Sequence, residues 1–410
     1  MWPSLGLIGF KRVVPPNDPD RAAQGSTGRA CGPGLGRNRY RVEKEMADDV
    51  QQASAVVPPG ALIYPLGAAP EADGAVEIAP GLLWMRMPLG GAMVGGTLSF
   101  INVWAIAEDD GWVIIDTGLH TDETFRAWRD VFAGVLHGRP VKRVIVTHLH
   151  PDHVGMAGWI TRKFGCRLWM TRLEFFQCRM LVADTGREAP PVGVDFYRAT
   201  GWDEDSLEAY RNRFGLFGKA VYQLPDSYRR ISDGEELTIG DHVWRVVVGA
   251  GHSPEHACLY CPALKLLISG DQVLPRITSN VSVFPTEPDG DPLSDWLTSL
   301  ARVKTLVPDE VLVLPAHNEP FIGLHARIDT LIAGHEHSLV KLEACLAEPK
   351  RVLDVFPALF RRPIKADSLI MATGESLAHL NCLIQRGRAE LSYDADGVAW
   401  YVATASAEAA

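Results

Sequence analysis

The sequence predicts a mixed α+β fold built around a cluster of histidine and aspartate side chains. Short apolar runs punctuated by glycine indicate β-strands, whereas residues 121–136 repeat their apolar side chains at helical spacing. The polar residues His148, His252, Asp271 and His317 each follow closely on an apolar run. We therefore expect several strand ends to meet at one edge and to bring together side chains that are distant in sequence.

The first half of the chain should alternate strands and helices from about residue 76 onwards. Apolar runs predict strands at 75–87, 98–106, 111–116, 144–147 and 167–170. Helical spacing predicts helices at 121–136 and 156–164. The glycine-rich segment 90–96 predicts a flexible hairpin or loop near the site.

The second half begins with an aromatic, charged and helical segment at residues 172–232. Its aromatic side chains are explained equally well by a satellite core and by a wall of the substrate site. Strands are then predicted at 230–239, 242–248, 257–260, 265–269 and 311–314. Helices are predicted at 327–346, 352–360 and 378–387, followed by a two-stranded hairpin with its turn at Asp396–Gly397.

The composition is that of a globular protein, and it argues against a polyanion-binding, a disulfide-stabilised or a membrane-spanning protein. The chain has 410 residues, 47% hydrophobic content and a net charge of −10, which argues against a broad basic surface for a polyanion. Seven scattered cysteines suggest no disulfide framework and favour a reducing cytoplasm. An apolar run long enough for a membrane span is missing from the sequence.

The beginning of the chain differs from the rest. Residues 1–45 are rich in glycine, proline and arginine, and we interpret them as a disordered leader, with Met46 as a candidate true start. Residues 46–75 are expected to form a loop-like connection to the folded part.

The stretch from Val144 to Gly155 carries the strongest chemical signal. His148, His150, Asp152 and His153 lie within six positions at the end of a predicted strand. Imidazole and carboxylate groups crowded in this way are typical of a zinc site, with iron or manganese as alternatives. Residues two apart on an extended backbone point the same way, so His148 and His150 form one ligand set. Asp152 and His153 lie beyond a proline and can face a second ion.

Residues 147–153, Thr-His-Leu-His-Pro-Asp-His, resemble the HxHxDH signature of the metallo-β-lactamase superfamily. The later ligands of that family are matched in order by His252, Asp271 and His317, and residues 114–118 resemble its preceding strand and turn. The resemblance implies a four-layer αββα sandwich for residues 76–324, with residues 172–232 as a helical insertion. Among its branches, this chain is similar to the glyoxalase II-like hydrolases.

The resemblance also implies how the ligands are shared between two Zn²⁺ ions per chain. His148, His150 and His252 would hold one metal, Asp152, His153 and His317 would hold the other, and Asp271 would bridge the two. Such a pair lowers the pKa of a shared water, so that a metal-bridging hydroxide becomes available near neutral pH. Asp152 would also orient this hydroxide, and Asp116 would accept a hydrogen bond from a ligand histidine.

The expected reaction is hydrolysis of a small ester-like substrate, a thioester or a lactone. Asp271 favours this branch, because many β-lactamases of the fold lack a bridging carboxylate at this position. Arg276 and Asn280, just past Asp271, are candidate substrate anchors, with a loop salt bridge as the alternative for Arg276. The alternative function is a phosphodiesterase or ribonuclease of the same fold. A metal-held binding module is a third interpretation, made improbable by the complete ligand set.

Residues 325–410 resemble the small winged-helix-like tail of one branch of the superfamily. Such tails suggest nucleic acid, but the segment that would contact it carries few basic residues, among them Arg386 and Arg388. We therefore expect the tail to serve packing or formation of a homodimer, and a nucleic-acid partner is not expected. His256, four residues after His252, is the remaining histidine of interest.

Overall fold

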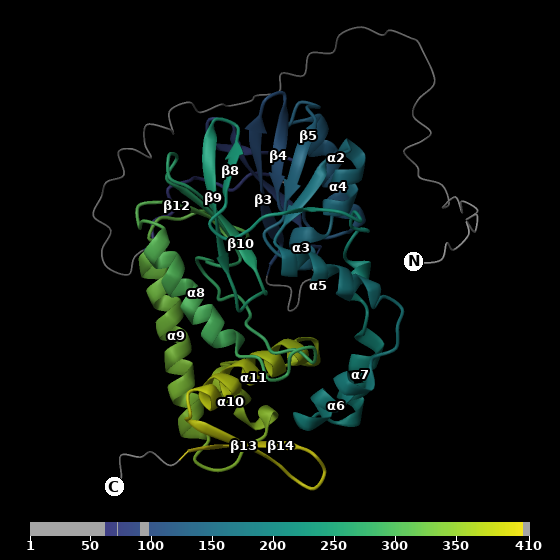
Figure 1. Ribbon diagram of the computed structural model, residues 1–410, viewed down its shortest axis with the longest axis vertical. Coiled ribbons are helices and arrows are strands. Elements are labelled where there is room, and N and C mark those ends of the chain that lie inside the picture. The colour runs from purple at the N-terminus through teal and green to yellow at the C-terminus, as the bar shows by residue number, and fades with distance from the viewer. Residues whose placement is uncertain (1–61, 72, 91–97, 405–410) are drawn as a thin grey trace, which may run out of the picture. The chain divides into compact units, whose positions relative to one another are not determined.

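Two β-sheets face each other in the upper half of the view in Figure 1. The computed structural model describes residues 62–71, 73–90 and 98–404, so the predicted leader 1–45 and most of the glycine-rich segment 90–96 lie outside the described residues. From residue 62 to residue 75, the described part of the expected loop-like connection contains one isolated β-bridge, from Ile63 to Ile322, and neither a helix nor a longer strand.

The first sheet pairs its strands in the order in which they occur along the chain. They are antiparallel from β1 to β4 and parallel from β4 to β7. In order, the strands of this sheet are β1 (Val76–Ala79), β2 (Leu82–Pro88), β3 (Phe100–Glu108), β4 (Gly111–Ile115), β5 (Val141–Ile145), β6 (Arg167–Met170) and β7 (Arg229–Arg230).

The second sheet has the order β12-β11-β10-β9-β8, and its one parallel pair among the described strands is β11 with β12. Its strands are β8 (Glu236–Ile239), β9 (His242–Gly249), β10 (His256–Cys261), β11 (Leu266–Gly270) and β12 (Leu312–Pro315). Buried apolar side chains fill the space between the two sheets, including Trp84 and Trp104, which stack at 6.2 Å, and Trp244.

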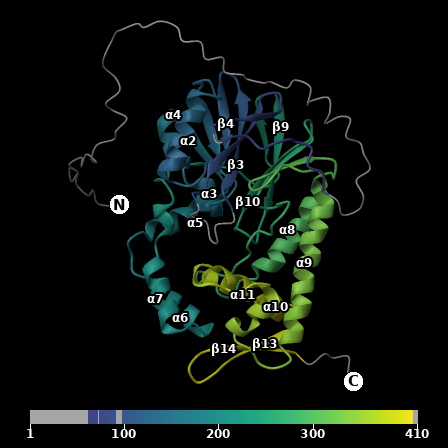
Figure 2. The same cartoon turned by 180° about the vertical axis from the view of Figure 1, so that it is seen from behind.

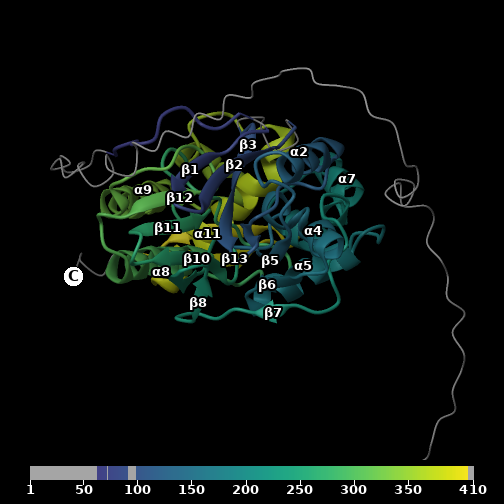
Figure 3. The ribbon, with the colours of Figure 1, turned by 90° about the horizontal axis from the view of Figure 1, so that it is seen from above.

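Helices cover the outer face of each sheet and complete four layers, which Figure 3 shows from above. On the first sheet lie α2 (Asp122–Ala133), α4 (Ala157–Phe164) and α5 (Arg172–Ala183), and on the second lie α8 (Pro292–Leu306) and α9 (Leu324–Cys345). Helix α2 begins where the Thr121 hydroxyl accepts the Thr124 N–H, and it buries Trp128 and Phe132 against the sheet. The mixed α+β sandwich predicted from the sequence is confirmed.

After α5 the chain continues into α6 (Pro191–Ala199), α7 (Glu204–Arg213) and the 3₁₀ turn η3 (Phe217–Lys219). Seen from behind, α6 and α7 extend away from the sheets toward the C-terminal helices (Figure 2). Tyr197 stacks on Trp202 at 4.4 Å and packs beside Tyr210, and this cluster contacts Leu353 and Leu369 of the C-terminal region. These aromatic residues therefore form a satellite core between the α6–α7 segment and the C-terminal region.

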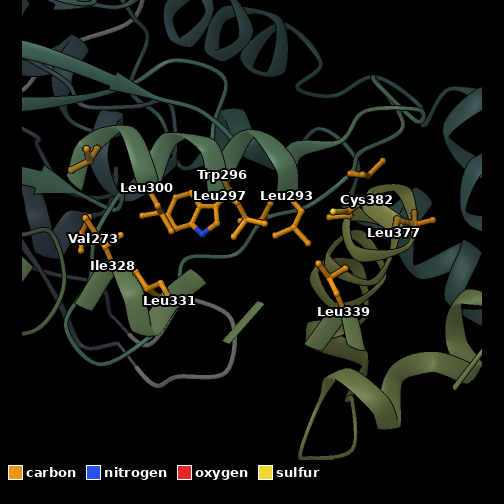
Figure 4. Close-up of a cluster of buried hydrophobic side chains, with 14 of the residues drawn as sticks. Val273, Leu293, Trp296, Leu297, Leu300, Ile328, Leu331, Leu339, Leu377 and Cys382 are labelled. Atoms are coloured by element: carbon orange, nitrogen blue, oxygen red, sulfur yellow. The ribbon is translucent and has the colours of Figure 1, made fainter. Parts of the chain in front are cut away.

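The described C-terminal region contains four helical elements after α9 and ends in a hairpin. The helical elements are η4 (Val352–Val355), α10 (Phe356–Leu359), η5 (Ala366–Ser368) and α11 (Leu369–Gln385). The hairpin pairs β13 (Ala389–Tyr393) with β14 (Ala399–Ala403). Figure 4 shows the core that joins this region to the sandwich, with Leu293 and Trp296 of α8 and Leu339 of α9 in one cluster with Leu377 and Cys382 of α11. The C-terminal region thus shares its main core with the outer layer of the second sheet.

Several predicted boundaries were wrong. The run 75–87 is a hairpin of two strands, because Pro80 and Gly81, with φ +76°, form a turn within it. The run 230–239 contributes to both sheets, as β7 and β8, with a turn at Gly234. The predicted helix 352–360 is a 3₁₀ turn followed by a short helix that ends at Leu359, and α11 starts at Leu369 rather than near residue 378. The predicted hairpin turn at Asp396–Gly397 is confirmed.

The described cysteines are all free. Cys258 and Cys261 both lie buried on β10, and burial raises the pKa of each thiol. Both thiols are therefore part of the buried core. Among the described helices, none is both long and apolar enough to span a bilayer.

Candidate metal centre

The predicted ligands of the first motif lie where β5 ends. His148 and His150 occupy the loop after the strand, and Asp152 and His153 lie in the short helix α3 (Pro151–Val154), with Pro151 at its first position. Asp116, directly after β4, adopts a left-handed backbone with φ +59° and accepts hydrogen bonds from the backbone N–H and the hydroxyl of Thr147, at 2.8 and 2.9 Å. This pair of bonds fixes the start of the ligand loop.

Three histidine ring nitrogens gather at the first of two adjacent positions. His148 Nε2 lies 2.9 Å from His150 Nδ1 and 3.3 Å from His252 Nε2. His252 comes from the loop between β9 and β10, on the opposite sheet. The three imidazoles therefore converge on one point that a cation can occupy.

The second position combines Asp152, His153 and His317. His317 Nε2 lies 3.3 Å from Asp152 Oδ2, and His153 Nε2 lies 3.7 Å from the same oxygen. Asp271, at the end of β11, stands between the two groups: its Oδ1 is 3.5 Å from His153 Nε2, and its Oδ2 is 3.4 Å from His252 Nε2. The structure therefore brings all seven predicted ligands together.

Polar atoms without partners show that these residues fit metal ions. Asp152 Oδ2, His153 Nε2 and Asp271 Oδ1 are buried and accept or donate no hydrogen bond within the described part of the chain. Leaving a buried polar atom unpaired costs about 1–3 kcal/mol. Because these atoms point toward one another and are the donor types that zinc prefers, two cations would satisfy them together.

Burial and neighbouring charges set the protonation of these groups. Burial, together with the adjacent imidazoles, lowers the pKa of His148 well below its usual value, and it lowers the pKa of His150 to about 3. Burial alone would lower the pKa of His153, but Asp116, Asp152 and Asp271 raise it well above the usual value. His148 and His150 are thus held as neutral imidazoles, the form that binds a metal.

The ring nitrogen that does not face the cluster has its own partner in four of the histidines. His148 Nδ1 meets the Thr147 hydroxyl at 3.1 Å, and His153 Nδ1 meets Asp116 Oδ2 at 2.8 Å. His252 Nδ1 lies 2.7 Å from the carbonyl oxygen of Asn280, and His317 Nδ1 lies 3.3 Å from that of Phe100. Such bonds orient a ligand ring and fix the tautomer that presents a lone pair to the metal.

Comparison with known proteins agrees with this geometry. The sequence profile of the metallo-beta-lactamase superfamily matches residues 96–317, and that of the metallo-beta-lactamase-like C-terminal domain matches residues 340–404. The chain belongs to the metallo-β-lactamase superfamily. A beta-lactamase domain protein from Burkholderia ambifaria is 38% identical, with a TM-score of 0.75, over 84% of this chain and 98% of its own. A metallo-beta-lactamase family protein from Thermus thermophilus is 25% identical, with a TM-score of 0.66, over 80% of this chain and 100% of its own length.

Curated relatives of this superfamily member have several activities. A linear primary-alkylsulfatase of Pseudomonas sp. is 23% identical over 53% of this chain. An atrochrysone carboxyl ACP thioesterase of Aspergillus fumigatus is 24% identical over 57%, and a hydroxyacylglutathione hydrolase of Maricaulis maris is 26% identical over 32%. The matches span 41%, 41% and 46% of the lengths of these three relatives.

The metallo-β-lactamase site contains a buried carboxylate that the sequence analysis missed. Glu174 of α5 accepts hydrogen bonds from the Leu149 N–H at 2.8 Å, the Ser253 hydroxyl at 2.7 Å and the Glu255 N–H at 2.8 Å. It therefore ties the loop carrying His148 to the loop carrying His252. Burial raises the pKa of Glu174 to about 7, although these three donors lower it.

Two further side chains hold ligand loops in place. His256 Nε2 accepts the Asp271 backbone N–H at 3.0 Å, so this buried histidine positions the candidate bridging residue and is no member of the candidate ligand groups. Asn102 donates to the carbonyl oxygens of Pro315 and Asn318, at 2.8 and 2.7 Å, and so holds the loop that carries His317. Only the position of His256, close after His252, gave a signal in the sequence.

The two candidate substrate anchors have partners within the protein. Arg276 is 53% exposed, pairs with Glu319 at 2.9 Å and lies 4.8 Å over the Tyr64 ring, which is the loop salt bridge considered as the alternative. The Asn280 side chain donates to Glu375 Oε2 at 2.9 Å. In this structure Arg276 thus forms a surface ion pair, and Asn280 supports His252.

Proposed function

We propose that this chain is a dinuclear metal-dependent hydrolase that acts on a small ester-like substrate, a thioester or a lactone. The observation that carries the proposal is the placement of Asp271, whose two oxygens face the two ligand groups separately, at 3.5 Å from His153 Nε2 and 3.4 Å from His252 Nε2. A carboxylate so placed suits a bridge between two metals. Zinc fits the donor set best, and iron and manganese accept the same ligands.

Two cations held in these groups would polarise the scissile bond and lower the pKa of an attacking water. The residues of the chain would orient the water and keep the ligand groups aligned. Asp152 Oδ2 faces His317 and His153 and would bind the metal, so the other carboxylate oxygen of Asp152 would orient the attacking water. Asp116 holds the His153 ring through Nδ1, and Glu174 holds the two loops that must stay aligned for both ligand groups to form.

The substrate class rests on the relatives and on the charge of the C-terminal region. Two of the curated relatives named above are named for thioester hydrolysis, the ACP thioesterase and the hydroxyacylglutathione hydrolase. The phosphodiesterase or ribonuclease alternative was motivated by the winged-helix-like tail, whose few basic residues include Arg386 and Arg388. In the structure, Arg386 pairs with Glu336 and Arg388 pairs with Glu343, so a carboxylate offsets the charge of each guanidinium group. The free cysteines agree with a reducing compartment such as the cytoplasm.

A substrate panel on the metal-loaded full chain tests this proposal. The panel contains S-lactoylglutathione, an aryl lactone, an alkyl sulfate and bis-p-nitrophenyl phosphate, each assayed with the wild type and with Asp152→Asn. We expect turnover of the thioester or the lactone, and a loss of at least about 100-fold in kcat with Asp152→Asn. Turnover confined to the phosphodiester or the sulfate would contradict the substrate class.

A further inference from the structure

The C-terminal helix α11 reaches the shell of the metal centre through the loop that follows Asp271. In this loop, Asn280 presents its backbone carbonyl oxygen to His252 Nδ1 at 2.7 Å. The position of that oxygen decides where His252 Nε2, its candidate metal-binding atom, points. Whatever fixes Asn280 therefore also fixes the orientation of this ligand.

Glu375 of α11 is the side chain that holds Asn280 from the C-terminal side. Its Oε2 accepts a hydrogen bond from Asn280 Nδ2 at 2.9 Å, and the Ser282 hydroxyl donates to Asn280 Oδ1 at 2.5 Å. Both ends of the Asn280 amide are thus engaged, which fixes its rotamer as well as its position. Glu375 is half-buried, and burial raises the pKa of its carboxyl group to about 7.

The backbone of the same loop docks directly on α11. The Val283 N–H donates to the Gly374 carbonyl oxygen at 3.1 Å. A Cβ atom at Gly374 would come within 2.7 Å of Ser282 Cβ, so the close approach requires glycine. Helix α11 is itself fixed, because the Trp202 indole donates to the Thr373 hydroxyl at 3.0 Å and Leu377 packs in the core shared with α8 and α9.

The other ligand group is positioned independently of α11. The His317 ring contacts the Phe100 carbonyl oxygen, and Asn102 holds the loop that carries His317; both residues belong to β3. The His153 ring contacts Asp116, which directly follows β4. A change at Glu375 should therefore reach one ligand group and spare the other.

We propose that Glu375 is a positioning residue for His252, acting through Asn280, so that the C-terminal region sets the affinity of one metal position. This inference rests on the proposed dinuclear site. It gives the C-terminal region a role inside the metal centre of its own chain, in contrast to a role in binding nucleic acid.

The test measures metal binding to the full chain, without substrate, in wild type, Glu375→Ala and Glu375→Gln. Zn²⁺ affinity is measured by competition with a chelator, and the ligand geometry is followed by the visible absorption of the Co²⁺-loaded protein. The matched control is Glu336→Ala, which removes another glutamate of the C-terminal region, one paired with Arg386. Asn280→Ala removes the same hydrogen bond from the other end and replaces Glu375→Ala if that variant fails to fold.

We expect Glu375→Ala to weaken one of the two metal equivalents by about 10–100-fold and to leave the other unchanged, with an altered Co²⁺ spectrum. Glu375→Gln keeps an oxygen that accepts from Asn280, so its affinities should stay within about 3-fold of wild type, and Glu336→Ala should match wild type. The inference is overturned if Glu375→Ala binds both equivalents as wild type does, or weakens both equally, or if Glu375→Gln is as weak as Glu375→Ala. A wild type that binds no metal would instead refute the proposed function.

Discussion

The removal of Glu174 should destabilise the protein and loosen both ligand loops at once. This carboxylate is fully buried and accepts three hydrogen bonds, two of them from the backbone N–H groups of Leu149 and Glu255. In Glu174→Ala these donors lose their acceptor, at a cost of about 1–3 kcal/mol for each buried group. Part of this cost is offset, since burying a carboxylate is itself unfavourable, as the rise of its pKa to about 7 indicates. We expect a net loss of about 2–4 kcal/mol in the free energy of unfolding.

Urea unfolding followed by tryptophan fluorescence measures this loss, with metal content determined on the same samples. Glu174→Gln keeps one acceptor oxygen but turns an amide N–H₂ toward a donor, so its loss should be intermediate, about 1–2 kcal/mol. The control Glu208→Ala removes an exposed glutamate of α7 and should change stability by less than about 0.5 kcal/mol. If Glu174→Ala unfolded within about 0.5 kcal/mol of wild type by this measure and kept its metal, Glu174 would not hold the two loops together.

Two further predictions concern residues away from the ligands. Burial and the adjacent His379 lower the pKa of His335 to about 4, so the unfolded chain binds a proton that the folded chain excludes between that value and about 6.5. The contribution of neutral His335 to the free energy of unfolding is fully present above about pH 6.5 and is lost as the pH falls toward 4. Between pH 7 and pH 5, the free energy of unfolding measured in urea should therefore fall by about 2 kcal/mol less in His335→Gln than in wild type. An equal fall in both proteins would argue against a buried neutral His335. Arg276→Ala should leave KM, kcat and metal affinity unchanged, because Arg276 forms an exposed ion pair with Glu319, and a rise in KM would return Arg276 to the substrate site.

The ligand groups could be predicted from the sequence because their chemistry is local. His148, His150, Asp152 and His153 lie within six positions, and each later ligand follows closely on a strand that the apolar pattern reveals. The spacing of these residues and the types of their donor atoms are therefore sufficient to predict the ligand groups. The fold class follows from the same strands, since they alternate with helices of clear periodicity.

The residues that hold the ligands in place could not be predicted in this way. Glu174 lies among apolar residues of a helix, and its partners Leu149 and Ser253 are 25 and 79 positions away in the sequence. Glu375 is 95 positions from Asn280. Pairings of this kind depend on tertiary packing, which the local pattern does not contain. For the same reason, Arg276 was expected near the substrate although the fold pairs it with Glu319.

The most direct measurement of the central claim is the number of metal ions bound per chain in wild type and in Asp271→Asn. Asp271 faces both ligand groups, so replacing one of its charged oxygens by an amide nitrogen, which cannot coordinate a cation, should disturb both positions. After reconstitution with Zn²⁺, we expect close to two ions per chain in wild type by inductively coupled plasma mass spectrometry, and a clearly lower number in Asp271→Asn together with loss of hydrolysis. A wild type that binds no metal, or a variant that binds two ions with wild-type affinity, would contradict the dinuclear site.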